Sequence, residues 1–420
     1  MNAEDEYLSL RRVGYRMGPE AEAEQRELRR PGMPGYVPLG FRVGDHGAWL
    51  CHPTIVARRI ESIGLKARAV EETLRGLPDE AAQSYRRSLI YSELVATNEI
   101  ENIHSSRAEI AALDIEEPEG DNPRRDPIHR RFSDFMRLYM RLAWGEMFTP
   151  EDGLPGIRAV YDAIASDGVA PEDKPDGELF RNQAEEIVTA SQKVIYRPPA
   201  RETEIVALLK RMLELWADPP TAQLVTACVC HYLFEVAHPF FDGNGRTGRF
   251  ILVSHLAQIL SVDAALAVSS AINEGKKRYY DAFLEVQNPL NRGDLTPFIV
   301  VMLDFIEDGV NRMAEDLSEK NKIYSRLRNL VGQTWSDNER RAAEYVVNSH
   351  IFGQFKQVRV RDELIDAMGL SWPTVREAID GLEREGFIRT VKKRPLIVAL
   401  SDAALAEYRL PEGEDVGDLD

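Results

Sequence analysis

Cysteine is scarce in this sequence, with three residues among 420: Cys51, Cys228 and Cys230. So few cysteines exclude a small extracellular module held together by disulfides. Cys228 and Cys230 lie two positions apart in an apolar run and match no zinc-ligand spacing, so we expect them to be buried as small apolar side chains. This cysteine usage is typical of a reducing compartment.

Long apolar runs are also missing. The stretch from Leu256 to Ile272 is interrupted by Asp263, and no run approaches the ~20 residues of a membrane-spanning helix. The first ten residues, MNAEDEYLSL, are acidic, whereas a secretory signal begins with basic residues. We therefore expect a soluble, cytoplasmic protein without a membrane partner.

Positive charge is in the minority, with 52 Lys and Arg against 69 Asp and Glu and a net charge of −17. An acidic chain repels phosphates on average, which excludes a nucleic-acid coat protein but allows one small basic module. The apolar fraction of 44% and the charged fraction of 29% are ordinary for a globular protein and exclude fibrous and fully disordered classes. At ~100–200 residues per domain, the length indicates two or three domains.

Helix, strand and loop signals predict a mostly α fold class and divide the chain into six segments. The first 52 residues are rich in Gly, Pro and charge and predict an extended arm, and the charged stretch EEPEGDNPRRDP predicts a loop before the next helix. The six predicted segments are an extended N-terminal arm (1–52), an N-terminal helical region (53–145), a helical core (146–310), a helical linker (311–335), a winged helix-turn-helix (336–405) and an acidic tail (406–420).

Residues 336–405 have the pattern of a winged helix-turn-helix. Helices are predicted at Ser336–Ser349 and Val360–Met368, and a third one begins at a capping Ser371 and ends at Gly386. Two β-like runs, FIRTV and LIVAL, follow and are joined by the basic turn KKRP. Between Phe355 and Leu400 it is slightly basic, with 9 Lys and Arg against 7 Asp and Glu, so DNA stays open as a partner. The mixed signs on the third helix leave protein interaction or dimerisation equally open.

Two apolar helices are predicted within the core, TAQLVTACVCHYLFEV and FILVSHLAQIL, and the first is apolar on most sides, as a buried helix is. Upstream of them, Glu186–Pro199 alternates apolar with polar residues and ends at a double proline, which predicts a short hairpin or flap.

Residues 238–249, which lie between the two apolar helices, read HPFFDGNGRTGR. The glycines let backbone N–H groups approach a ligand closely, and the helix that follows directs its free N–H groups and its positive dipole end at the loop, an arrangement that favours phosphate. Arg246 and Arg249 lie three positions apart and can hold one ligand with bidentate contacts. Asp242 is a hard oxygen ligand suited to Mg²⁺ on phosphates, and His238 can act as a base near neutral pH.

The stretch is not a Walker A loop, because GxxxxGK[ST] is absent, nor a Rossmann fingerprint, because no strand precedes it. It resembles the signature of the Fic family, HxFx[DE]GNGRxxR, at every specified position. The resemblance covers about residues 80–305 and implies a helical Fic core with a small β-hairpin flap. The simpler alternative is a Gly-rich turn with a salt-bridged arginine pair.

The resemblance implies transfer of AMP from ATP to a Ser, Thr or Tyr hydroxyl of a target protein, so the expected partners are ATP and a protein with an acceptor hydroxyl. His238 would deprotonate that hydroxyl, Asp242 would hold the expected cofactor Mg²⁺, and Phe240 would pack inward. An anion hole would form from the backbone of Gly243–Gly245 with Asn244, and the two arginines would bind the β- and γ-phosphates. The implied nucleotide-binding residues of the stretch are Gly243, Asn244, Gly245, Arg246, Thr247, Gly248 and Arg249.

Two further features are similar to those of Fic proteins. The predicted flap resembles the family's hairpin that aligns the target chain by strand addition, although an ordinary surface hairpin has the same pattern. Tyr279 and Tyr280, with Asn288 beyond them, resemble residues that contact the adenine end of the nucleotide. Packing on a helix face is nearly as good an explanation for the two tyrosines.

Residues 97–102, TNEIEN, match the inhibitory motif [ST]xxxE[GN] of many Fic proteins. In those proteins the glutamate pairs with the second arginine of the signature and blocks the ATP γ-phosphate, which here implies a pair between Glu101 and Arg249. The glutamate shares one helical stripe with Ile90, Leu94 and Thr97, so its carboxylate is directed inward and needs a partner. The alternative is a solvated glutamate at a helix end.

Three functions stay open. The first is an autoinhibited protein adenylyltransferase, which the intact His238 favours. The second is a DNA-binding regulator whose Fic core senses nucleotide, and the third is a Fic enzyme that removes AMP or transfers another phosphate-linked group. A second copy of the chain also stays open as a partner, because the sequence does not determine the oligomeric state. His231 and Glu235 lie one turn apart but form no HExxH, so we expect packing rather than metal binding.

Overall fold

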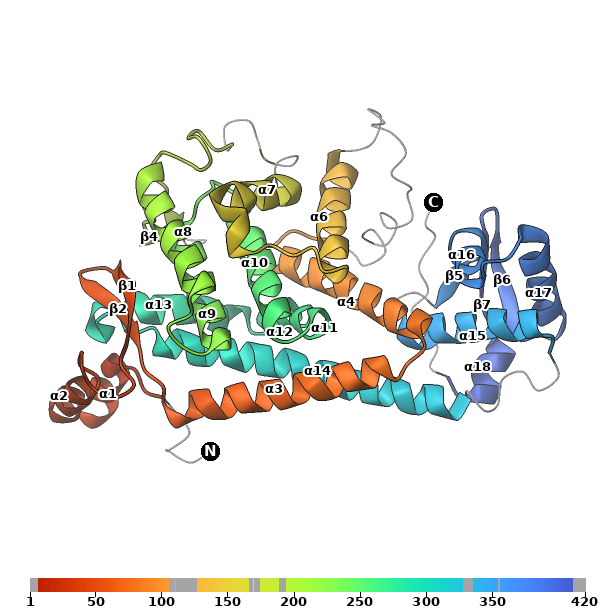
Figure 1. Ribbon diagram of the computed structural model, residues 1–420, viewed down its shortest axis with the longest axis horizontal. Helices are drawn as coiled ribbons and strands as arrows, with labels where there is room; N and C mark the ends of the chain where they lie inside the picture. The colour runs from red at the N-terminus through yellow and green to blue at the C-terminus, as the bar shows by residue number, and fades with distance from the viewer. Residues whose placement is uncertain are drawn as a thin grey trace. The chain divides into compact units, whose positions relative to one another are not determined.

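The computed structural model is mostly helical (Figure 1). It describes residues 7–105, 110, 127–165, 169, 174–188, 194–327, 335–353 and 356–410. These residues form two compact units. Those of unit 1 lie within Met1–Arg68, Val95–Ser105 and Gly120–Asn311, and those of unit 2 lie within Ala69–Leu94, Ser106–Glu119 and Arg312–Asp420. Among the described helices, none is both long enough and apolar enough to cross a membrane.

Unit 1 contains short helices and two hairpins around a set of buried helices. Its elements are α1 (Leu10–Met17), α2 (Pro19–Leu28), β1 (Val37–Val43), β2 (His46–Leu50), the first part of α3 (Thr54–Arg75), the end of α4 (Asp79–Ile100), α6 (Pro127–Ala143), η2 (Pro150–Asp152), α7 (Gly153–Ala165), β3 (Ile187–Val188), β4 (Val194–Tyr196), α8 (Glu202–Ala217), α9 (Gln223–Ala237), α10 (Asn244–Ile259), α11 (Val262–Ala265), α12 (Val268–Glu274), α13 (Lys276–Gln287), η5 (Pro289–Asn291) and the first part of α14 (Thr296–Leu327).

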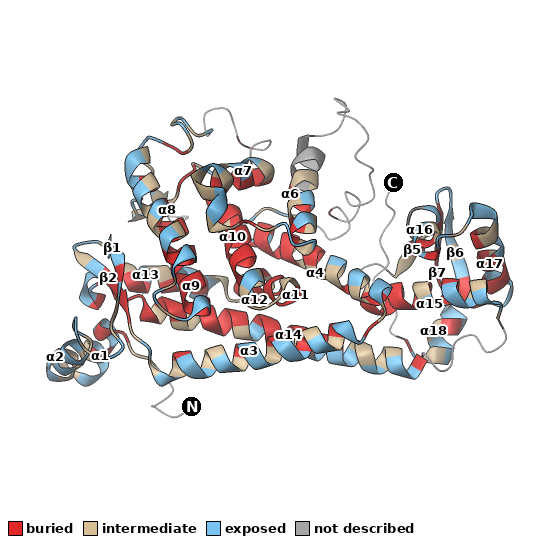
Figure 2. Cartoon of the chain, viewed as in Figure 1, coloured by how far each residue is buried: buried red, intermediate tan, exposed pale blue. Residues whose placement is uncertain are grey.

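Helices α9 and α10 form the centre of unit 1. Helix α9 packs against α8 and α10, and α10 also packs against α7 and α11. Almost every residue of α9 is buried, as its continuous apolar sequence predicts, and both helices are mostly red in Figure 2. Cys228 and Cys230 are buried with it, as expected. The loop that joins these two central helices is therefore held between rigid elements.

The prediction of an extended arm over residues 1–52 is wrong. Ser9 caps α1 by accepting a hydrogen bond from the Arg12 backbone N–H, and Gly18, at φ 95°, separates α1 from α2. Strands β1 and β2 pair antiparallel as a hairpin, with Val37 opposite Leu50. Gly18, Gly32, Gly35 and Gly44 lie between short elements at positive φ, which costs glycine little.

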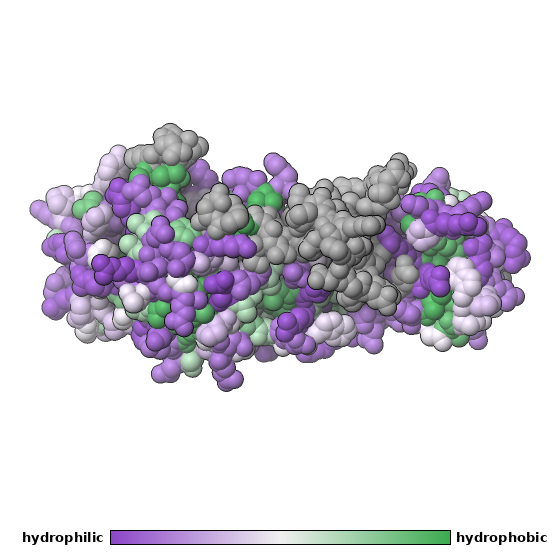
Figure 3. All heavy atoms as spheres, turned by 90° about the horizontal axis from the view of Figure 1, so that it is seen from above, coloured by the Kyte–Doolittle hydropathy of each residue, from purple (hydrophilic) through white to green (hydrophobic). Residues whose placement is uncertain are grey.

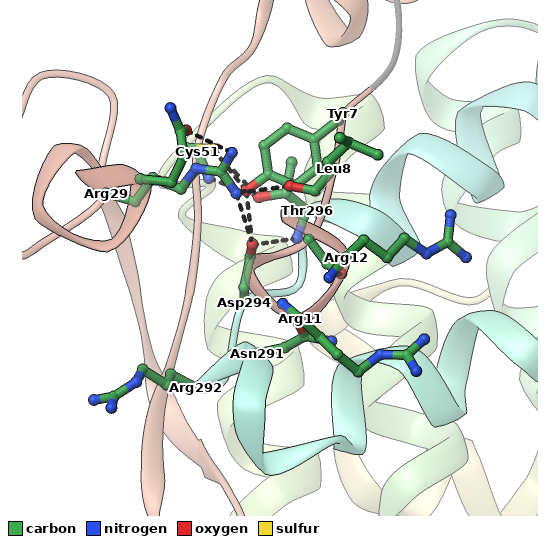
Figure 4. A network of polar contacts seen from close by, with 12 residues as sticks. Tyr7, Leu8, Arg11, Arg12, Arg29, Cys51, Asn291, Arg292, Asp294 and Thr296 are labelled. Atoms are coloured by element: carbon green, nitrogen blue, oxygen red, sulfur yellow. Dashed lines mark hydrogen bonds and ion pairs between the residues drawn. The ribbon is translucent and has the colours of Figure 1, made fainter. Parts of the chain in front are cut away.

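A polar network holds the N-terminal elements against the rest of unit 1 (Figure 4). The Tyr7 hydroxyl donates to Asp294 Oδ2 at 2.6 Å, and the Arg11 backbone N–H donates to Asn291 Oδ1 at 2.9 Å. Arg11 also forms an ion pair with Glu285. Asp294 is fully buried, and burial raises the pKa of its carboxyl above the ordinary value. These contacts fix the N-terminal segment against the end of α13 and η5.

The predicted flap is a hairpin. Strands β3 and β4 pair antiparallel, with Ile187 opposite Tyr196, while residues 189–193 at its tip lie outside the described residues. The Tyr196 hydroxyl donates to the carbonyl oxygen of Val236 in α9 at 2.9 Å. The second strand of the flap is thereby tied to the last turn of the central helix.

Unit 2 ends in a small three-stranded sheet with helices. Its elements after α14 are α15 (Asp337–Phe352), β5 (Gln357–Arg359), the π-helical turn η6 (Val360–Leu364), α16 (Ile365–Met368), α17 (Trp372–Arg384), β6 (Ile388–Lys393), β7 (Leu396–Leu400) and α18 (Asp402–Tyr408). The sheet is antiparallel in the order β5-β7-β6. The predicted helices and the predicted pair of strands are present, and β5 and α18 are additional elements. A winged helix-turn-helix remains our interpretation of the module.

Caps at the helix ends of unit 2 agree with the sequence in all but one case. Ser336 and Glu339 form a capping box at the start of α15, and Gly369 ends α16 at φ 61°. Ser371 precedes α17 as expected, but its hydroxyl lies 2.9 Å from the Thr374 hydroxyl and makes no capping hydrogen bond.

Several predicted segments fall partly outside the described residues. Helix α14 runs unbroken to Leu327 across the predicted boundary at 310, and residues 328–334 of the predicted linker are not described. The predicted loop at 116–126 and the acidic tail from 411 onward also lie outside, and the other domain boundaries stay predictions. Over the described surface shown in Figure 3, hydrophobic residues are interspersed among a hydrophilic majority.

Candidate active site

The loop between α9 and α10 is built on two left-handed backbone positions. His238 ends α9 at φ 45°, ψ 62°, and Gly243 precedes α10 at φ 80°. Between them the Asn244 side chain closes the loop, since its Oδ1 accepts from the Phe240 N–H at 2.9 Å and its Nδ2 donates to the Phe240 carbonyl at 2.7 Å. The Asn244 side chain therefore stabilises the loop from within. This geometry does not support the expected contribution of that side chain to an anion hole.

Phe240 anchors the loop to the core, as expected. Its ring is fully buried and stacks on Tyr161 of α7, with 3.7 Å between ring centroids and an angle of 11° between the planes. Phe180 meets the same ring edge-on at 5.7 Å. Two aromatic contacts therefore hold the loop at the start of α10.

The start of α10 presents backbone amides to the space beside Arg249. The first N–H groups of a helix have no intrahelical acceptor and attract anions. An added Cβ at Gly245 would lie 2.0 Å from Glu101 Oε1, and one at Gly243 would lie 2.7 Å from the Ala165 Cβ. Both glycines are therefore needed for close approach, by a carboxylate in one case and by α7 in the other.

Thr247 and Gly248, two of the implied nucleotide-binding residues, are buried in α10. An added Cβ at Gly248 would lie 2.3 Å from Glu235 Oε1 and 2.7 Å from the Phe234 ring, so this face of the helix packs against α9. The Thr247 N–H donates to the Gly243 carbonyl. The structure thus places Gly248 at a helix contact rather than toward the loop.

Arg249 and Glu101 form the pair that the resemblance implies. Arg249 Nη2 donates to Glu101 Oε1 at 2.8 Å, and the exposed fractions of the two side chains are 1% and 31%. Arg249 also donates from Nε to the Thr97 hydroxyl at 2.7 Å and from Nη2 to the Thr97 carbonyl at 3.0 Å. Among the described residues the guanidinium therefore has three acceptors, two from Thr97 in the last turn of α4 and one from Glu101, which follows that helix.

The end of α4 explains the residue that follows Glu101. Asn102 adopts φ 58°, the left-handed position where helices end and where Gly and Asn are favoured. The Ile103 N–H closes the turn by donating to the Asn98 carbonyl at 2.9 Å, and Lys276 donates to Asn102 Oδ1 at 2.8 Å. The terminus that carries Glu101 is thus fixed both locally and by α13.

Asp242 and Arg246 face each other at the end of the loop, the first exposed and the second buried. The Asp242 side chain is 60% exposed, its Oδ1 accepts from the Gly243 N–H at 2.6 Å, and its Oδ2 lies 3.7 Å from Arg246 Nη2. Arg246 is almost fully buried. No group of three or more His, Cys, Asp or Glu side chains suited to a metal occurs in the described part of the chain. A single exposed carboxylate fits Mg²⁺ that is held mainly by nucleotide phosphates and water, because this ion rarely occupies an all-protein cage.

His238 is poised as a neutral base. Burial, assisted by the positive charge of Arg181, lowers the pKa of its imidazole to about 4, against opposing effects of Glu101 and Asp242. Its Nδ1 has no hydrogen-bond partner within the described residues. At neutral pH the ring is therefore unprotonated and able to accept a proton.

Two residues near the loop were not predicted from the sequence. Arg181 is fully buried and donates to the His238 carbonyl from Nε at 2.7 Å. Burial raises the pKa of Glu235 to about 8 despite the opposing charge of Arg249. Arg181 lies 57 positions before the loop in the sequence, and no spacing rule connects it to His238. Glu235 is one helical turn before the loop, which could have indicated that it faces the site.

The three residues implied at the adenine end have different partners. The buried Tyr279 hydroxyl lies 2.7 Å from His231 Nε2, so it packs against α9, whereas Tyr280 is 42% exposed and its hydroxyl lies 3.5 Å from the Ile100 carbonyl. The Asn288 side chain accepts from the Leu290 N–H and caps η5. Tyr280 is the most exposed of the three, and its hydroxyl lies against the residue that precedes Glu101.

The loop follows His238, is closed by the Asn244 side chain and leads into the buried helix α10 with its two buried arginines. This arrangement is suited to binding an anion. The Fic/DOC family matches this chain over residues 156–256. Residues 156–256 therefore form a Fic domain. The matched span includes the loop but neither Glu101 nor the tyrosines of α13.

Known proteins are similar over about a quarter of the chain. The protein adenylyltransferase Fic of Aedes aegypti is 30% identical over 106 residues, 24% of this chain and 19% of that protein. The protein of the same name from Drosophila yakuba is 29% identical over 106 residues, 24% of this chain and 20% of its own length. This chain thus spans about a fifth of the length of these relatives.

A solved structure is similar over much more of the chain. The Fic family protein from Desulfovibrio desulfuricans G20 matches with a TM-score of 0.52 and 19% identity, over 83% of this chain and 96% of that one. At this identity the similarity shows the fold, a mostly helical Fic fold.

Proposed function

We propose that this chain transfers AMP from ATP to a Ser, Thr or Tyr hydroxyl of a target protein, and that Glu101 restrains this activity. The observation that supports the proposal best is the loop itself: a neutral His238 ends α9, and Arg249 in the helix that follows the loop is already paired with a carboxylate. The two insect relatives are named adenylyltransferases, which agrees with this reaction.

In the proposed step, the hydroxyl oxygen of the target attacks the α-phosphorus and its proton passes to the imidazole of His238. The bond between the α-phosphorus and the bridging oxygen to the β-phosphate breaks, and pyrophosphate leaves. Asp242 would hold Mg²⁺, which when bound supplies charge neutralisation on the phosphates. Backbone amides at the start of α10 and the guanidinium of Arg246 would stabilise the remaining negative charge.

The flap would present the target. Its two strands are short, and Val188 and Ile195 are 37% and 39% exposed. A hairpin with exposed residues beside the catalytic loop can accept an extended segment as an added strand. The acceptor hydroxyl would then be delivered to the side of the loop where His238 lies.

The direct test is incubation of the chain with α-labelled ATP, Mg²⁺ and a cell lysate, followed by mass spectrometry of labelled proteins. Addition of AMP to a Ser, Thr or Tyr side chain supports the proposal. Release of AMP from modified proteins would instead support the removal reaction, with Glu101 activating water. Transfer of a different phosphate-linked group would contradict the choice of AMP.

A second candidate function rests on the C-terminal module. Lys392 and Lys393 end β6 rather than lying in the predicted turn, and Arg394 follows them in the turn to β7. All three are exposed, the arrangement expected of a basic wing. Helix α17 carries both signs, with Arg376 and Asp380 paired at 2.7 Å. We therefore propose DNA as a further partner of this module, which the salt dependence of its binding to duplex DNA would test.

A further inference from the structure

Arg181 is a buried cation beside the catalytic loop. It has no role in the reaction step proposed above. It lies just before the flap, and its side chain is fully buried. Burial by itself lowers the pKa of the guanidinium, which is a sign that the charge is held at a cost. A buried arginine of this kind is kept by its hydrogen bonds, and these point to its role.

Three hydrogen bonds connect Arg181 to its surroundings, and two of them reach the loop. Its Nε donates to the His238 carbonyl at 2.7 Å, and its backbone N–H donates to the Pro239 carbonyl at 2.9 Å. The third, from Nη1 to the Gln183 carbonyl at 2.6 Å, holds the beginning of the flap segment. One residue thus bonds both the histidine and the chain that leads into the flap.

His238 needs such support, because a non-glycine residue in the left-handed conformation persists only where its surroundings fix it. The carbonyl that receives the Arg181 bond belongs to the strained residue itself. The other strand of the flap is tied to the same region, by the bond from Tyr196 to the Val236 carbonyl. Arg181 therefore links the loop to the segment that leads into the flap, and Tyr196 links the second flap strand to the end of α9.

We infer that Arg181 is a positioning residue: it holds His238 in its left-handed conformation and fixes the flap relative to it, so that a hydroxyl on a flap-bound segment meets the imidazole. This inference rests on the proposed AMP transfer. Small misplacements of reacting groups cost large factors in rate, so the effect falls on the chemical step rather than on nucleotide binding.

The charge of Arg181 provides an independent signature. The charged groups that face His238 are Arg181 before the flap, Glu101 at the end of α4 and Asp242 in the loop. The arginine lowers the pKa of the imidazole, and the two carboxylates raise it. Removing the positive charge therefore raises the pKa of His238, whereas a lysine at the same place keeps the charge but cannot reproduce the fork of donors.

The experiment compares Arg181→Gln and Arg181→Lys in a Glu101→Gly background, with Arg211→Gln as the matched control. Arg211 also donates from Nε to a backbone carbonyl, that of Leu39 at 2.9 Å, but lies in α8 away from the loop. We expect kcat for AMP transfer to fall about 100-fold in both Arg181 variants, with KM for ATP unchanged. The control should match its parent.

The second readout does not depend on transfer. In histidine-labelled protein, the His238 ring signal is identified by its loss in His238→Ala and followed by NMR as a function of pH. Its pKa should rise in Arg181→Gln and stay in place in Arg181→Lys. If Arg181→Gln does not fold, a lower kcat with unchanged KM for ATP in Arg181→Lys supports the inference, and an unchanged kcat overturns it.

Three results would contradict the inference: kcat within twofold of the parent in Arg181→Gln, an unmoved His238 titration in that variant, or an equal loss in Arg211→Gln. The last two would assign Arg181 to general stability. Absence of AMP transfer in Glu101→Gly itself would instead refute the proposed function, and the NMR titration would still test Arg181.

Discussion

Replacing Glu101 with glycine removes the carboxylate oxygen that accepts a 2.8 Å hydrogen bond from Arg249 Nη2. The backbone should tolerate the change, since Glu101 follows Ile100, the last residue of α4, and its N–H bond to the Asn98 carbonyl is retained by glycine. Arg249 keeps its two bonds to Thr97. The variant therefore frees one position on an oriented guanidinium, which a γ-phosphate can occupy.

The size of the effect follows from the contact that ATP has to displace. A hydrogen bond to a charged group stabilises a protein by about 1.5–3 kcal/mol. The Glu101 side chain is 31% exposed, which places this pair toward the lower end because solvent screens it. Each 1.36 kcal/mol is tenfold in rate, so transfer should rise by about 10-fold in Glu101→Gly.

The assay measures incorporation of label from α-labelled ATP with Mg²⁺ and lysate, at several ATP concentrations. A sharper comparison sets Glu101→Gln against Glu99→Gln. Both variants lose one carboxylate from the same turn, but Glu99 bonds Asn273 instead of Arg249. We expect a gain only at position 101. Arg249→Ala should show no gain, since it removes the phosphate ligand together with the pairing partner of Glu101.

Equal labelling by Glu101→Gly and the unaltered protein, at every ATP concentration, would refute this reasoning. Glu101 would then be a residue at a helix end with a structural pair and no restraint on transfer. A gain in Glu99→Gln as large as in Glu101→Gln would also refute it, because it would point to loosening of α4 rather than to release of Arg249.

Three further predictions concern the base, a buried acid and the basic turn. His238→Ala should lower AMP transfer by about 10²- to 10⁴-fold while ATP binding, measured by calorimetry, persists, and an unchanged rate would eliminate His238 as the base. Burial raises the pKa of Glu235 from 4.5 to about 8, so the folded protein binds a proton that the unfolded chain releases, and stability falls as pH rises through that interval. Glu235→Gln should therefore raise the melting temperature at pH 8.5 relative to the unaltered protein but not at pH 4, and a pH-independent difference would contradict the assignment. Changing Lys392, Lys393 and Arg394 to Ala should weaken binding to duplex DNA and flatten its salt dependence, and if the unaltered protein does not bind mixed fragments at low salt, the module does not use DNA.

Features encoded by neighbouring residues were predictable from the sequence. The apolar run of α9 predicts burial, and Gly369 and Ser336 mark helix ends correctly. The N-terminal 52 residues were not, because Gly and Pro predict turns without indicating how much structure lies between them. Short helices such as α1 and α2 are stabilised mainly by tertiary contacts, among them the bond from Tyr7 to Asp294, and these contacts cannot be seen in the local sequence.

The candidate site divides in the same way. The inward packing of Phe240 and the pair between Glu101 and Arg249 follow from motifs whose members carry fixed spacings. The internal role of the Asn244 side chain could not be foreseen, since an amide can serve a ligand or the loop equally well. Arg181 was invisible, because only the folded chain brings it to His238.

The bonds of Arg249 indicate how the proposed restraint of AMP transfer could be released without disordering the site. Two of its three hydrogen bonds go to Thr97 and one to Glu101, so withdrawal of the carboxylate leaves the guanidinium oriented. The Thr97 hydroxyl, at the first position of the [ST]xxxE[GN] motif, thus orients Arg249 independently of Glu101. A side chain already fixed in place loses little conformational entropy when a phosphate replaces a carboxylate. The proposed restraint is therefore a competition between two anions for one donor, whose outcome depends on ATP concentration and on whatever holds the end of α4, where Lys276 bonds Asn102.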